Sequence, residues 1–168
     1  MTSYLLKFTR GRSWDVLHLD WLQEGEVQSD PITDLRTKEG KLSVWEIDAD
    51  RTNLELVLLA LACSRQNFDP LDFGLFDVGA LGELGIGVED KKGDSPVPRA
   101  NKYHRDLTSL TISRLAGLIY AIFPVIDKDR KLPGQVRKLV LDAWTSDVDQ
   151  DSIDHRLKQR IEEALSAP

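Results

Sequence analysis

The stretch KLSVWEIDADRTNLELVLLALACSRQNFDPLDFGLFD, residues 41–77, gives the strongest indication of the fold. Residues 41–48 alternate apolar side chains and are rich in β-branched and aromatic residues, which predicts a strand. Residues 50–66 are apolar nearly all round after Asp50, which predicts a buried helix capped by that aspartate. Residues 71–77 predict a further strand. The stretch therefore places a buried helix between two strands.

Toward the N-terminus, residues 3–9 (SYLLKFT) predict one more strand. Residues 13–25 fit two patterns, because their apolar side chains are spaced for a helix and also alternate as in a strand; we favour the helix. Residues 30–40 begin with Asp-Pro, a good cap followed by a good first helical residue, and end at a glycine. They predict a short helix or a turn.

From Asp106 onward the sequence predicts only helices. The first follows Asp106, carries a stripe that begins at Ile112, and ends at Pro124. The second covers residues 133–144, and the third begins with Ser152 as its cap. The apolar positions expected to face the core are Ile112, Leu115, Ile119, Ile122, Val136, Leu139, Val140, Ala143, Trp144, Ile153, Leu157, Ile161 and Leu165.

The expected fold is therefore α+β, with a small sheet of about three strands in the N-terminal half and a helical C-terminal half. The chain has 168 residues, of which 41% are hydrophobic, enough to bury a core without a metal or a disulfide. Since no repeat or linker is visible, we expect a single domain over residues 1–168. Residues 77–105 are rich in glycine and basic residues, which predicts an irregular loop or a hairpin around residues 89–94 (EDKKGD).

The composition restricts the function. The formal net charge is −6, whereas a duplex-binding domain usually carries a basic surplus, so we expect nucleic acid only through a local basic loop. An acidic surface suits a basic protein partner. Cys63 is the single cysteine and lies in an apolar helical run, which indicates an inert buried thiol. With no signal-peptide pattern and no long apolar span, we expect a cytoplasmic protein that does not use the membrane, and we take it as bacterial.

No cofactor or metal motif is complete. The glycine run of residues 79–87 (GALGELGIG) matches neither the dinucleotide nor the P-loop spacing, so we expect no cofactor. Asp147, Asp149 and Asp151 are spaced like the start of a calcium loop, but Ser152 replaces the turn glycine and Lys158 the final glutamate. The three histidines form no metal-binding pair, so we expect no metal site.

The best candidate site is VPRANKYHRDL, residues 97–107, because it reverses the charge of an acidic chain. As a binding site its predicted contact residues are Arg99, Lys102, Tyr103, His104 and Arg105. Such a set could grip a phosphate, with His104 as proton donor or acceptor. The simpler interpretation is a solvated basic loop that ends where Asp106 caps the following helix.

Arg99 and His104 also have the spacing R-x₄-H. This is similar to the short signature of HEPN-type ribonucleases, in which such an arginine and histidine act on the scissile phosphate. The resemblance covers six residues, and Ala100 stands where that signature usually has a polar residue. A spacing this short arises readily by chance, so it does not assign the family.

Two hypotheses for the function follow. The first is a non-catalytic bacterial interaction protein: an accessory, immunity-like or antitoxin-like partner that acts through its surface. Trp14, Trp21 and Trp45 would anchor a partner if they were exposed, but we favour packing in the core for each of them. The second is a small enzyme for RNA or a nucleotide, with Arg99 and His104 as catalytic residues and Arg10 and Arg12 as helpers.

Overall fold

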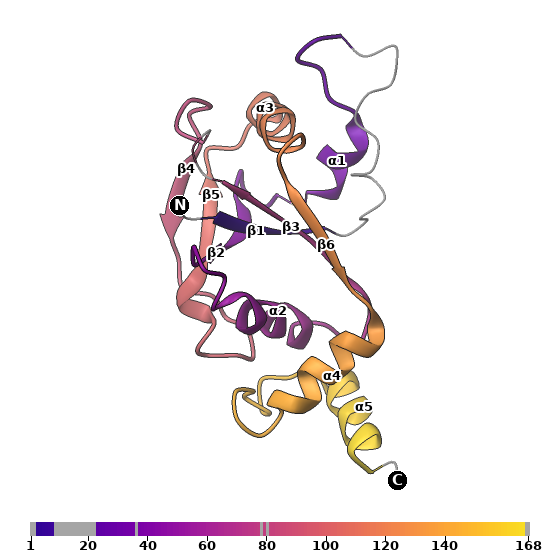
Figure 1. Cartoon of the computed structure of the whole chain (residues 1–168). Helices are drawn as coiled ribbons and strands as arrows, with labels where there is room; N and C mark the ends of the chain where they lie inside the picture. The colour runs from indigo at the N-terminus through magenta and orange to yellow at the C-terminus, as the bar shows by residue number, and fades with distance from the viewer. Residues whose placement is uncertain (1–2, 9–22, 36, 78, 80, 167–168) are drawn as a thin grey trace.

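In the part of the chain that the structure describes, six strands form one antiparallel sheet in the order β4-β5-β2-β1-β3-β6 (Figure 1). The computed structural model describes residues 3–8, 23–35, 37–77, 79 and 81–166. The strands are β1 Ser3–Phe8, β2 Leu42–Ile47, β3 Leu71–Asp77, β4 Gly87–Asp90, β5 His104–Thr108 and β6 Asp127–Lys131. The helices are α1 Ser29–Asp34, α2 Leu54–Cys63, α3 Ile112–Ile122, α4 Pro133–Ala143 and α5 His155–Ser166.

The strand–helix–strand prediction for residues 41–77 is confirmed by β2, α2 and β3. β1 lies between β2 and β3 and is antiparallel to both, so β2 and β3 run in the same direction. Two strands that run in the same direction need a crossover, and α2 supplies it. The predicted cap is wrong: α2 begins after Asn53, while Asp50 accepts hydrogen bonds from the backbone N–H and the hydroxyl of Thr52.

Helices cover both faces of the sheet (Figure 1). On the first face, Leu5, Ile47 and Phe73 belong to one buried apolar cluster with residues of α2, α4 and α5. The second face packs against α1 and α3, with Tyr4 and Val44 among its buried residues. Because side chains alternate along a strand, one sheet supplies both halves of the core.

The α+β class is confirmed, but the predicted sheet of about three strands and the all-helical C-terminal half are wrong. β4 lies inside the expected loop 77–105, and β5 and β6 lie in the C-terminal part of the chain. β4 (GVED) and β6 (DKDRK) are the two edge strands and are largely exposed. Exposed edges have no apolar face and tolerate charge on both sides, so they show no alternation of apolar and polar residues in the sequence.

Two other predicted caps are corrected. Asp106 lies inside β5, and the cap of α3 is Thr111, whose hydroxyl accepts a hydrogen bond from Arg114 N–H. At the start of α5, the Asp154 carboxylate accepts from Arg156 N–H, whereas Ser152 donates its hydroxyl hydrogen bond to Asp149.

The apolar stripes of the C-terminal helices are largely confirmed. Val136, Val140 and Trp144 of the α4 stripe are buried, as are Leu157 and Ile161 on α5. Two positions are wrong, because the side chains of Ile112 and Leu165 are exposed to solvent.

Residues 9–22 lie outside the described part of the chain. Almost all of the helix expected at residues 13–25 therefore falls there, together with Arg10, Arg12, Trp14, His18 and Trp21. Trp45 is described, and it is buried in the core, so it cannot anchor a partner. Within the described ranges, no helix has the length and apolar character needed to cross a bilayer.

Candidate functional site

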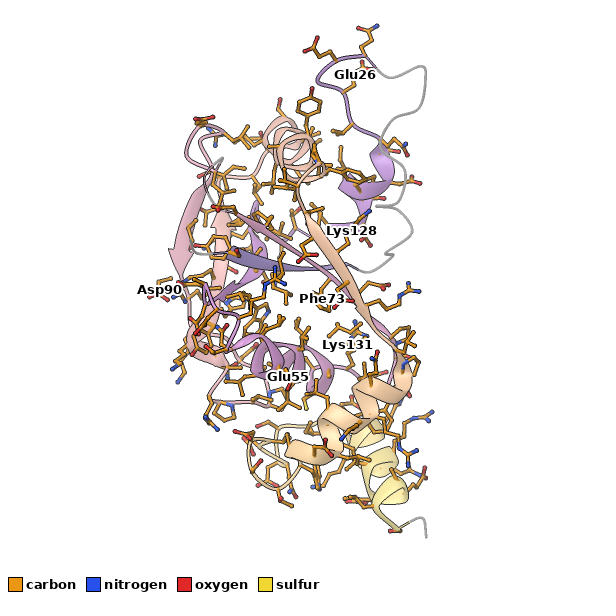
Figure 2. All side chains as sticks on the ribbon, in the orientation of Figure 1. Glu26, Glu55, Phe73, Asp90, Lys128 and Lys131 are labelled. Carbon is orange, nitrogen blue, oxygen red and sulfur yellow. The ribbon has the colours of Figure 1, made fainter. Side chains whose placement is uncertain are left out.

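A hollow of about 430 Å³ opens where the start of α2, the end of α4 and the segment around Arg99 meet. A second hollow of about 310 Å³ adjoins it and shares Glu55, Leu139 and Asp142 with the first. We call the two together the α2–α4 groove. Figure 2 labels Glu55 on α2 and Lys131 at the end of β6, and both residues line the second hollow.

The floor of the groove is apolar. Leu56 and Leu59 come from α2, Leu139 and Ala143 from α4, and Tyr103 from the segment before β5. Leu59 is buried, whereas the other four are only half-buried and leave apolar surface open to the groove. Leu139 and Ala143 are four residues apart, so helical periodicity places them on one side of α4.

The rim of the first hollow is acidic. Four carboxylates line it, those of Asp48, Glu55, Asp142 and Asp147, and Arg99 is the single basic residue among the described ones that do so. Three of the carboxylates already have partners. Asp147 pairs with Arg99 at 2.5 Å, Asp142 pairs with Lys138 at 2.7 Å, and Asp48 accepts a hydrogen bond from Thr52.

Glu55 differs from the other three carboxylates. Within the described residues its carboxylate has no hydrogen bond or ion pair, and its side chain is exposed. The first hollow therefore keeps a net negative character, because one arginine and the neighbouring Lys138 face four carboxylates.

The residues predicted from the basic stretch separate into different environments. Arg99 and Tyr103 line the groove, and Lys102 lies beside them with its ammonium 4.8 Å from the centre of the Tyr103 ring. His104 and Arg105 do not line it. In β5, His104 and Asp106 point to one face of the sheet and Arg105 to the other, because strand side chains alternate.

His104 is buried in a polar cluster that is satisfied internally. Its Nδ1 lies 2.8 Å from the carbonyl oxygen of Lys91, and its ring meets the edge of Trp45 with centroids 5.2 Å apart. Its Nε2 lies 3.8 Å from the carboxylate of Asp106. Asp106 is itself buried and pairs with Lys91 at 3.2 Å. These contacts hold β5 against β2 and against the segment around Lys91 that follows β4.

Arg105 is also engaged within the fold. Its guanidinium pairs with Glu46 at 2.7 Å and with Asp90 at 3.1 Å, and so links β5 to both neighbouring strands. Arg99, Arg105 and Lys91 each have a carboxylate partner. The basic stretch therefore does not present a converging set of free cations to a phosphate.

The other groups considered from the sequence have structural surroundings. Cys63 is buried as a free thiol, and burial raises its pKa to about 12. His155 is exposed at the start of α5. In the part of the chain that the structure describes, no cluster of three or more histidine, cysteine or acidic residues could hold a metal ion.

No family model, no curated protein and no solved structure matches this chain. The groove residues Glu55, Leu56 and Asp142 were not predicted from the sequence. Each of them sits within an ordinary helical pattern, and only the packing of α2 beside α4 brings them together. The sequence places Asp147 in an incomplete calcium loop, whereas in the structure it lies on the rim of the groove.

Proposed function

We propose that this chain is a non-catalytic interaction protein that binds a basic surface of a partner protein through the α2–α4 groove. In a bacterial cytoplasm such a protein acts as an accessory, immunity-like or antitoxin-like partner. The supporting observation is the excess of negative charge: among the described residues, four carboxylates line the first hollow, and the single arginine there is already paired with one of them.

The electrostatics favour a cationic protein over a phosphate compound. Carboxylates around a hollow repel a phosphate and attract lysine or arginine side chains, and the net charge of −6 acts in the same direction at longer range. Complementary charge speeds encounter and disfavours wrong partners, while apolar contacts supply much of the affinity. The groove offers both an acidic rim and an apolar floor.

The alternative, an enzyme with Arg99 and His104 as catalytic residues, has weaker support. The two side chains have different surroundings: Arg99 is paired with Asp147 at the rim, whereas His104 is buried beside Trp45 and Asp106. A general acid or base must reach the group that it protonates or deprotonates. No observation on the described residues favours catalysis over binding.

The proposed function is tested by charge reversal in the groove. Glu55→Lys with Asp142→Lys reverses two exposed carboxylates that both hollows share. The tagged wild-type chain should retain a stoichiometric protein from cells of its own organism. The double variant should lose at least about 90% of that protein, because a loss of only about 1.4 kcal/mol of binding free energy already weakens the affinity tenfold.

The matched control is Glu83→Lys with Glu162→Lys, which changes the net charge equally at exposed positions that do not line the groove. It should retain the partner. Recovery of the wild-type chain without any partner, or equal recovery of a partner by all three proteins, would contradict the proposed function.

A further inference from the structure

We propose that the partner element received by the α2–α4 groove is a basic amphipathic α-helix, with apolar side chains on the floor and arginines or lysines on the acidic rim. The inference rests on the proposed function and specifies the structure of the partner. It follows from three properties of the groove, namely its floor, the backbone of its walls and its distribution of charge.

The floor requires apolar contacts. Leu56 and Ala143 are half-buried in the first hollow, and Leu139 is half-buried where the two hollows meet. A purely polar basic segment would leave this apolar surface without a partner. Two successive apolar side chains of the partner, one in each hollow, would cover this surface and contribute to the affinity.

The walls favour a helix over an extended segment. α2 and α4 are helices, whose backbone N–H and C=O groups are bonded along their own axes. An extended peptide gains much of its affinity from backbone hydrogen bonds to a sheet edge, and among the described residues that line this groove only Lys131, the last residue of β6, belongs to a strand. A bound helix satisfies its own backbone and presents apolar side chains at i, i+3, i+4 and i+7.

The charge changes along the groove and predicts how the helix lies. Asp48 and Asp147 line the first hollow but not the second. The second contains Lys131 and Lys138 beside the shared carboxylates, so its charge is close to balanced. We expect the basic residues of the partner helix to concentrate over the first hollow.

Synthetic peptides test this inference with the full chain. The first is an amphipathic peptide of about four helical turns with leucines at i, i+3, i+4 and i+7 and arginines on both sides of that stripe. The second has the same composition in a scrambled order without a stripe. Fluorescence anisotropy at physiological ionic strength should show the first peptide binding at least about tenfold more tightly than the second, and circular dichroism should show it becoming helical.

The groove variant Glu55→Lys with Asp142→Lys should weaken binding of the amphipathic peptide at least about tenfold, and Glu83→Lys with Glu162→Lys should change it less than about twofold. Thermal unfolding confirms that both variants fold. Equal affinity for the two peptides, or equal binding by the two variants, overturns the helix proposal. If a cellular partner is still lost only from the groove variant, the proposed function survives that result. Peptide binding without any cellular partner contradicts the proposed function instead.

Discussion

Arg99, His104 and Arg105 are close in sequence, yet each has a different environment. The Arg99 side chain is 73% exposed and pairs with Asp147 at the groove, whereas Arg105 bridges Glu46 and Asp90 on the sheet. His104 is 9% exposed and contacts Trp45 and Asp106. The turn of the chain into β5 and the alternation along that strand separate the three. At the scale of residues, these neighbouring side chains therefore make three separate sets of contacts and form no common site.

His104→Ala should destabilise the protein by about 2 kcal/mol, because it removes the ring contact with Trp45 and leaves the carbonyl of Lys91 without its partner. Urea unfolding measures the loss. Lys92→Ala is the control, since Lys92 is exposed nearby and should change stability by less than about 0.5 kcal/mol. A His104 variant as stable as the wild type would show that the histidine is not a structural residue.

The helices and strands differ in how strongly their sequences predict them. α2 is buried along most of its length and has a continuous apolar sequence, while β4 and β6 are edges built from charged residues. Arg130 on β6 forms a two-point ion pair with Asp72 on β3, so charge itself helps to hold this edge in place. α4 lies between these extremes. A narrow apolar stripe of α4 packs toward α2, and the opposite side of α4 is exposed.

Val140→Ala should destabilise the protein by about 2 kcal/mol, because Val140 is fully buried between α4 and the core and its truncation leaves a cavity. Arg137→Ala on the exposed side of the same helix should change stability by less than about 0.5 kcal/mol. Thermal unfolding of both variants compares them directly. Similar losses in the two variants would mean that α4 does not pack through this stripe.

At the scale of the whole molecule, α2 and its thiol lie within the core that the sheet shares with α4 and α5. Burial raises the pKa of Cys63 from 9.0 to about 12. Between these two values the folded chain keeps the thiol proton and the unfolded chain loses it. The contribution of Cys63 to stability is therefore fully present below pH 9 and falls as the pH rises toward 12.

The wild type should accordingly lose about 1.4 kcal/mol of stability by pH 10, relative to pH 7, that Cys63→Ala does not lose. Denaturant unfolding of both proteins at each pH measures this difference, and the constant cost of the substitution cancels between the two pH values. A pH-independent difference between the two proteins would show that the thiol ionises equally easily in the folded and unfolded chains.

The sequence by itself determined the parts of the fold that are buried and apolar. β2, α2 and β3 were predicted because burial demands apolar side chains at fixed periods, and the α4 and α5 stripes followed from the same requirement. The exposed edges β4 and β6 carry no such requirement, and β5 was missed because its buried polar residues depend on distant partners such as Lys91.

The candidate site depended on the tertiary structure still more. Glu55 and Asp142 are 87 positions apart and become neighbours across one groove only when α4 packs beside α2, and no local pattern records that packing.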